Sequence, residues 1–265
     1  YDRGHWTWEM DQIHRLSLTD DVVTLMQGRL GQLPEKTQAL LKTAACLGNR
    51  FELTTLAAAV GLPLGTVTAG LWTALTEGLI VPLGETYVQG EAGAELELEQ
   101  STGTAIAYRF LHDRVQQAAY HLIPVAERAA LHLRIGRQLK QKLADHRATD
   151  NLFAIANHLN AGQTLISDPA ETLELIYFNQ LAARKAQGAI AYETAANYLA
   201  IALQLTSQTT APPLLIRNLY EQAAEVAYLR KQWAAMETFA AAALARTREP
   251  YEQVAIYKVK ISANV

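Results

Sequence analysis

Apolar residues recur every three to four positions along most of the chain, which is the spacing of one face of an α-helix. In the first part this spacing predicts four short helices that begin near Thr19, Pro34, Glu52 and Leu64, with glycines at their ends. From Asp113 onward it predicts a helix-only region over residues 113–122, 151–161, 170–188, 190–206, 214–230, 232–247 and 251–262, with a further helix marked by Leu131, Ile135, Leu139 and Leu143. Prolines at 169, 212, 213 and 250 stand where these helices can begin.

Between residues 79 and 110 the apolar residues instead recur at every second position, which is the spacing of a β-strand. Leu79–Val81 and Tyr87–Val88 predict the strands of a hairpin, and the alternation of Ile106, Tyr108 and Phe110 predicts a further strand. Gly90–Gly103 reads as an acidic loop, although its alternating Leu and Glu residues could instead extend a strand. Three helices followed by a hairpin is the element order of a winged helix. We therefore predict a mainly α fold, with a winged-helix domain and a small β-wing before a helical array.

The helical array contains an internal repeat. A shift of 41 positions places Ala182, Ala183 and Ala186 on Ala223, Ala224 and Ala227, and Tyr192 on Trp233. Small residues let paired helices approach closely, as in tetratricopeptide-type (TPR-like) hairpins, whose usual period is about 34 residues. The extra length fits in the loop Ser207–Pro213. The chain has 45 Ala and 38 Leu, so a chance coincidence in an alanine-rich bundle is the alternative.

Charge is distributed unevenly, although the net charge is only −3. Residues 51–108 contain seven Glu and no Lys, Arg or Asp, and therefore carry −7. DNA binding through the predicted helix Leu64–Glu77 needs basic side chains to neutralise phosphates, so this charge argues against a nucleic-acid partner. A candidate interaction patch lies further along the chain, either a solvated helix face or a docking site for an acidic partner, and consists of Arg128, Arg134, Arg137, Lys140 and Lys142.

The sequence contains neither a catalytic nor a metal-binding motif. The single Cys46 lies on an apolar helix face, where an inert thiol is expected, and the seven histidines show no spacing typical of a metal site. No nucleophile elbow is present, so we predict neither catalytic residues nor a metal. No signal-peptide pattern and no apolar run of about 18 residues occur, which predicts a cytoplasmic protein without a membrane span. The first residue is Tyr1, so we expect a piece of a longer protein.

Several segments carry a resemblance to a known family. They are LLKTAACLGNRF at 40–51, FLHDRVQQAAY at 110–120, ANHLNAG at 156–162 and the Trp-rich segment 6–26. The chain resembles the middle region of large bacterial signalling proteins, in which a STAND-type ATPase is followed by helical repeats and joined to serine/threonine kinase and histidine kinase modules. The resemblance implies that residues 1–19 are the tail of an absent ATPase domain, 20–123 the winged helix and 124–265 truncated TPR-like repeats.

The same resemblance implies a role for two residues. His112 and Asp113 are similar to the His-Asp pair of STAND switches, in which the histidine contacts the β-phosphate of ADP. The alternative is that Asp113 merely caps a helix and His112 packs at the wing. The chain has no phosphate-binding loop and no kinase motif, so ATP or ADP is implied for the full-length protein and no cofactor for this region.

We therefore expect a non-catalytic regulatory region that restrains a nucleotide switch. Its partners would be its own ATPase and kinase domains, together with an unknown protein or ligand on the repeats. One alternative is the ligand-sensing part of a transcriptional regulator that binds DNA directly or through a missing domain. Another is a scaffold with a vestigial winged helix.

Overall fold

The protein is described by a computed structural model covering residues 18–83, 106–142, 151–247 and 250–263. The chain divides into two compact units, residues 1–131 and 132–265, and each is described by itself. The division falls inside helix α7 (Val125–Lys142), whereas the sequence predicted a boundary after residue 123.

Unit 1 contains the helices predicted from the apolar spacing. Helices α3, α4 and α5 follow one another, and α6 packs against α2 and α3. Their bounds are α2 Leu18–Gly31, α3 Glu35–Leu47, α4 Leu53–Val60, α5 Leu64–Thr76 and α6 Asp113–His121. The predicted ends at Gly48 and Gly61 are confirmed, because these glycines cap α3 and α4.

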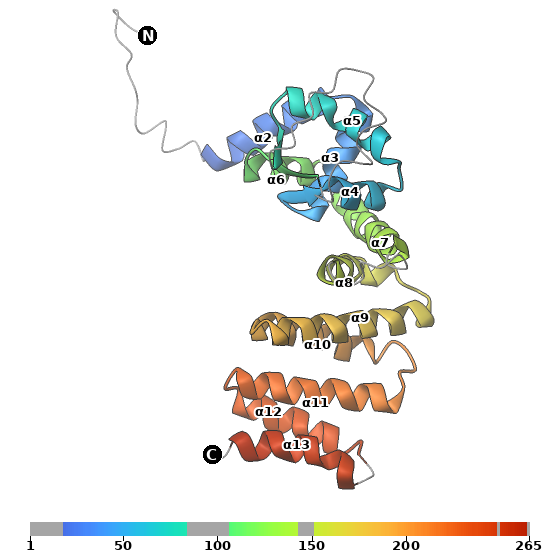
Figure 1. Cartoon of the computed structure of the whole chain (residues 1–265), viewed down its shortest axis with the longest axis vertical. Helices are drawn as coiled ribbons and strands as arrows, with labels where there is room; N and C mark the ends of the chain where they lie inside the picture. The colour runs from blue at the N-terminus through green and yellow to red at the C-terminus, as the bar shows by residue number, and fades with distance from the viewer. Residues whose placement is uncertain (1–17, 84–105, 143–150, 248–249, 264–265) are drawn as a thin grey trace, which may run out of the picture. The chain divides into compact units, whose positions relative to one another are not determined.

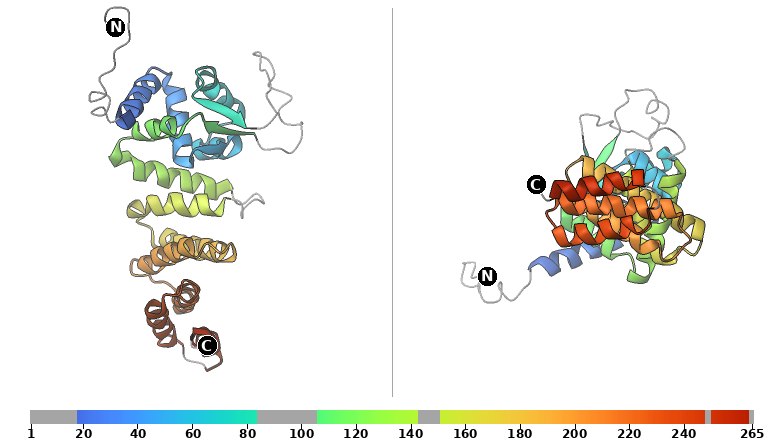
Figure 2. Two further views of the ribbon diagram at one scale, coloured as in Figure 1. Left: turned by 90° about the vertical axis from the view of Figure 1, so that its left-hand side faces the viewer. Right: turned by 90° about the horizontal axis from the view of Figure 1, so that it is seen from below.

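A three-stranded antiparallel sheet completes unit 1. Its strands are β1 (Arg50–Glu52), β2 (Ile80–Leu83) and β3 (Ala107–Phe110), with β3 in the centre. Strands β2 and β3 lie side by side in Figure 2. The predicted strand at Ile106–Phe110 is confirmed, and β2 pairs with it. The proposed hairpin partner Tyr87–Val88 and the loop Gly90–Gly103 lie outside the described residues.

Strand β1 was not predicted from the sequence, and its last residue, Glu52, is also the N-cap residue of α4, at the predicted start of that helix. Phe51 alternates with exposed Arg50 and Glu52 and stacks on Tyr108, with ring centroids 6.0 Å apart. Phe110 lies on the same face and is fully buried. The aromatic face of the sheet therefore closes the core of unit 1 against α3, α4 and α5.

Helices α3 and α5 approach closely at Gly70. A Cβ atom there would lie 2.5 Å from the Leu40 Cδ1 atom, so only glycine fits without displacement of Leu40. The buried Thr37 hydroxyl donates to the Gly70 carbonyl at 2.8 Å, which satisfies the polar group at this crossing.

Unit 2 contains the remainder of α7 and six further α-helices among the described residues (Figure 1). Helices α9, α11 and α13 each begin at a proline, as predicted. Helix α10 packs on α9, α12 packs on α11, and α13 packs on both α11 and α12. The bounds are α8 Leu152–Ala161, α9 Pro169–Gly188, α10 Tyr192–Leu205, α11 Pro213–Leu229, α12 Trp233–Leu244 and α13 Pro250–Ala263.

The 41-residue repeat recurs in the backbone geometry. Ile190 after α9 and Lys231 after α11 have φ of 62° and 58°, values that residues with a side chain seldom adopt. Each turn is closed by the equivalent bond, from the Ala191 N–H to the Ala186 carbonyl and from the Gln232 N–H to the Ala227 carbonyl, both 2.9 Å. Two helix pairs therefore turn in the same way, which a chance similarity of alanines does not explain.

The coarse fold prediction is confirmed, since the protein is mainly helical with one small sheet. Within the described residues, every helix is too short or too polar to cross a membrane alone. Helices α4 and α5 together have enough length and apolar character, but they meet at a bend of 108°.

Candidate functional site

His112 and Asp113 lie at the start of α6. His112 is the N-cap residue, with an extended backbone, and its carbonyl accepts the Val115 N–H at 2.9 Å. Asp113 is the first helical residue, and the His112 side chain makes no capping hydrogen bond at the start of α6. Both side chains are exposed. The residues of the proposed wing, 84–105, lie outside the described residues, so both readings of this pair stay predictions.

The predicted basic patch begins in unit 1 with Arg128. Its Nε atom donates to the Ile123 carbonyl at 3.2 Å, and its guanidinium lies 4.7 Å from the centre of the Tyr120 ring. Arg128 is therefore partly buried and holds the turn between α6 and α7. Arg134 is exposed, and the Lys142 side chain lies outside the described residues.

Arg137 and Lys140 bind acidic residues of α9 within unit 2. Arg137 donates two hydrogen bonds to Glu171, at 2.8 and 2.7 Å, and Lys140 donates to Glu174 at 2.6 Å. The residues are three apart on each helix, so they form two parallel ion pairs. The bonds from Arg137 lower the pKa of Glu171 despite its partial burial. Part of the predicted patch is thus engaged with an acidic partner in its own unit.

A pair of histidines joins α7 to α8. The Nδ1 atoms of His132 and His158 are 2.8 Å apart, and the rings stack with centroids 5.0 Å apart. Burial first, and then the charge of His132, lower the pKa of His158 to about 4. One ring nitrogen donates this hydrogen bond and the other accepts it. The two histidines are 26 residues apart in sequence, so no short spacing between histidines predicts this pair.

Buried amides continue this polar interior between α8 and α9. Asn160 and Asn179 exchange two hydrogen bonds of 2.8 Å, and Asn179 also donates to the Leu175 carbonyl. Asn179 is completely buried. The Tyr198 hydroxyl donates to Asn157 at 2.8 Å, so α10 is joined to α8 as well.

The single cysteine agrees with the inert thiol that was predicted. Cys46 is partly buried on α3, and burial raises its pKa to about 12, against the opposing effect of Arg128. A thiol with this pKa carries almost no thiolate at pH 7, and the thiolate is the nucleophilic form.

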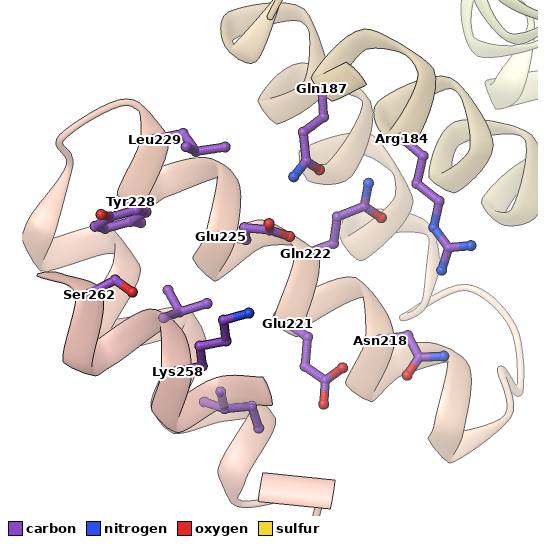
Figure 3. A pocket seen from close by; sticks show the side chains of 12 residues that line it. Arg184, Gln187, Asn218, Glu221, Gln222, Glu225, Tyr228, Leu229, Lys258 and Ser262 are labelled. Carbon is purple, nitrogen blue, oxygen red and sulfur yellow. The ribbon is translucent and has the colours of Figure 1, made fainter. Parts of the chain in front are cut away.

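A cavity of about 500 Å³ lies between α9, α11 and α13 (Figure 3). Arg184 and Gln187 line it from α9, Gln222 and Glu225 from α11, and Lys258 from α13. Sequence reasoning assigned no site here, because the three helices are far apart along the chain. The only available signal was the placement of polar residues beside the alanine contacts of α9 and α11.

The described residues contain no cluster of three or more His, Cys, Asp or Glu side chains that could hold a metal ion. The arrangement offers exposed donors at His112 and a polar cavity in unit 2, which suit ligand or partner binding.

Comparison with known proteins gives one informative similarity. The chain is 30% identical to hybrid signal transduction histidine kinase G of Dictyostelium discoideum over 234 residues. The alignment covers 76% of this chain and 7% of that protein, so the chain spans a small part of the relative. No family model matches the chain, and no solved structure matches it. The similarity agrees with the predicted resemblance to signalling proteins at the level of signal transduction.

Proposed function

We propose that this chain is the non-catalytic regulatory region of a signalling protein that also contains ATPase and kinase domains. The similarity to the Dictyostelium histidine kinase carries the proposal. It covers 76% of the chain and therefore includes parts of both units. The proposed role is to restrain a nucleotide switch through unit 1 and to receive a signal on unit 2.

Unit 1 is a winged-helix domain in this proposal. The order α3, β1, α4, α5, β2, β3 supports it, with three helices before the two long strands and β1 at the far edge of the sheet. Unit 2 is a TPR-like array, supported by the equivalent turns after α9 and α11. Arrays of this kind stack helix pairs and present extended binding faces.

His112 is the proposed contact to nucleotide. Its exposed ring stands at the first turn of α6, where main-chain N–H groups lack partners within a helix and attract anions. A phosphate on the ATPase domain would find a neutral or charged imidazole donor and the positive end of the helix dipole at one place. ADP held there stabilises a closed form, and release of the contact shifts the population to an open form.

The test requires a longer protein that includes the upstream nucleotide-binding domain. We expect His112→Ala to accelerate ADP release at least tenfold in a fluorescent-nucleotide chase. His121→Ala is the matched control, because His121 is exposed at the other end of the same helix. Unchanged release from His112→Ala, or equal acceleration by both variants, would reject the contact.

DNA binding by this chain is the competing function, and the surface of α5 disfavours it. Trp72 is 47% exposed on this helix, and the helix has no Lys or Arg. Phosphate neutralisation supplies most non-specific affinity for DNA, so a regulator of this kind would depend on another domain. A gel shift of the 265-residue chain with duplex DNA at low salt should show no complex.

A further inference from the structure

The outer face of the sheet in unit 1 places two arginines directly opposite each other. Arg50 on β1 and Arg109 on β3 are register partners in the antiparallel pair, and both are exposed. The Phe110 N–H donates to the Asn49 carbonyl at 2.9 Å, so the neighbouring Arg50–Arg109 position is a non-hydrogen-bonded pair. At such positions the Cα atoms are about 4.5 Å apart, and opposite side chains are at their closest. The two arginine side chains therefore leave the sheet side by side.

This arrangement is unfavourable for the fold alone. Like charges directly opposite each other destabilise a sheet, whereas opposite charges stabilise it. Among the residues that the structure describes, neither guanidinium forms an ion pair with a carboxylate. Glu52 lies on the same face of β1 but is diagonal to Arg109, and diagonal neighbours in such a ladder are about 7–8 Å apart. Departures from local structural preference of this kind are expected at functional sites.

The pair also concentrates positive charge at one place. Arg50 and Arg109 flank residues 51–108, which contain no Lys or Arg, and the antiparallel pairing of β1 with β3 brings the two together. On its other side Arg109 faces Val81 of β2, which carries no charge. The sheet therefore presents two adjacent cations that an anion can bridge.

The chemistry of the pair selects a class of anion. A guanidinium is always charged, and its planar fork donates two parallel hydrogen bonds to phosphate or carboxylate oxygens. A phosphate monoester carries nearly two negative charges at pH 7 and has three acceptor oxygens, so it can bind both forks and neutralise both charges. A phosphodiester, as in DNA, carries one charge and leaves one of the two cations uncompensated.

We propose that the outer face of the sheet binds a phosphate monoester between Arg50 and Arg109. The site is distinct from the proposed nucleotide contact, because His112 caps α6 and is not part of the sheet. Its test needs no upstream domain, so failure of this site and failure of the His112 contact are separate results.

The probes are N-acetyl-phosphoserine amide, AMP and dimethyl phosphate, each titrated at low salt into the ¹⁵N-labelled 265-residue chain. The Nε–H signals of Arg50 and Arg109, assigned by their loss in Arg50→Gln and Arg109→Gln, are followed by NMR. We expect saturable shifts of both signals with the two monoesters, and at least fivefold weaker binding of dimethyl phosphate, which has a single charge. Each Gln variant should weaken monoester binding at least fivefold, followed on the remaining arginine. The tighter of the two monoesters identifies the source of the phosphate, a phosphorylated side chain or a nucleotide.

Arg134→Gln is the matched control, because Arg134 is exposed on α7 in unit 2. This variant and His112→Ala should bind both monoesters as the parent chain does. Absence of saturable shifts at the two arginines would overturn the phosphate site. Equal affinity for dimethyl phosphate and the monoesters would also overturn it, as would equal weakening in Arg134→Gln or His112→Ala.

Arg50→Glu gives an independent measurement, because it places opposite charges in register on β1 and β3. We expect its urea midpoint to exceed that of the parent without phosphate, and the monoesters to raise the midpoint of the parent but not of this variant. A midpoint at or below that of the parent, or an equal rise with monoester in both proteins, would contradict the proposal.

Discussion

The two units differ in which polar side chains they bury and in how those side chains are hydrogen-bonded. In unit 1 the buried polar residues of the described part are Thr37 and Thr43, whose hydroxyls donate to main-chain carbonyls at 2.8 and 3.0 Å. One buried oxygen, Oδ1 of the partly buried Asn49, has no hydrogen-bond partner in that part. Unit 2 buries an imidazole and three amides on neighbouring helices: His158, Asn179, Gln180 and Gln222. Its interior therefore combines buried polar groups with apolar contacts, such as those between α11, α12 and α13.

This difference indicates that the core of unit 1 serves stability, whereas the interior of unit 2 also carries polar groups suited to recognition. Unit 1 packs large apolar side chains against a sheet, and its hydroxyls are satisfied locally, so the core specifies one structure and offers little to a ligand. Among the described residues, unit 2 pairs His158 and Asn179 across helices but leaves the Gln222 amide and the Nε2 atom of Gln180 unpaired. The unit with the less complete hydrogen bonding is the one we assign to recognition.

The largest effect should come from the apolar core of unit 1. Phe110→Ala removes a fully buried ring that packs 5.7 Å from Phe51 and should lower the unfolding free energy of unit 1 by about 3–5 kcal/mol. Hydrogen exchange read helix by helix should show faster opening of α3 and α5, while α9–α12 keep their protection. Equal loss of protection in both units would contradict the division into two independent cores.

The histidine pair should make unit 2 sensitive to pH. His158 has a pKa near 4 in the folded chain and about 6.5 when unfolded, so the unfolded state takes up a proton first as the pH falls. The stability that neutral His158 contributes is present above pH 6.5 and is lost toward pH 4, by about 2 kcal/mol between pH 7 and 5.

Hydrogen exchange of α8 at pH 7 and 5, corrected for intrinsic rates, measures this change. His158→Gln should flatten the pH dependence, whereas His121→Gln, at an exposed site in unit 1, should leave it unchanged. This window lies above the range in which Glu171 titrates, because the Arg137 bonds lower its pKa. A slope in His158→Gln equal to that of the parent would exclude His158 as its source.

Two glycines of unit 2 should respond to alanine in opposite directions. At Gly136 a new Cβ atom would lie 2.7 Å from the Leu159 Cδ2 atom and 3.1 Å from its main-chain nitrogen, so α7 and α8 must move apart. Gly136→Ala should cost about 1–2 kcal/mol, typical of overpacking, even though alanine favours helix. Gly188→Ala meets no atom within 4 Å and should stabilise by up to about 1 kcal/mol. Urea unfolding of both variants gives the comparison, and stabilisation by Gly136→Ala would show that α7 and α8 tolerate separation.

Sequence alone predicted the helices of unit 2 to within a few residues, because each buries a stripe of alanine and leucine and several begin at prolines. It also predicted the 41-residue repeat. It missed β1, since three residues with a single buried side chain give almost no period, and the strand's partner β3 lies more than 50 residues away. Pairing of this kind depends on tertiary contacts.

The candidate sites were harder to predict for a related reason. His112 could be found because a local motif marks it, but its exposure became known only from the structure. The partners of Arg137 and Lys140 lie 34 residues away, so no local pattern separates a solvated basic face from an internal ion pair. Gln222 is unpaired because of what α9 and α13 place around it, which no window of sequence contains.

The smallest expected effects come from one polar-to-apolar substitution in each unit. The two changes in unfolding free energy should have opposite signs. Thr37→Val removes a satisfied hydroxyl in unit 1, and with it the hydrogen bond that this hydroxyl donates to the Gly70 carbonyl, so it should destabilise by about 1 kcal/mol. Gln222→Met removes an unsatisfied amide at similar volume and should stabilise unit 2 by about 1 kcal/mol. Urea midpoints for the two variants test the signs directly. If Gln222→Met instead destabilises the chain as Thr37→Val does, then the Gln222 amide is satisfied in the free protein, and this pair of variants does not distinguish the two units.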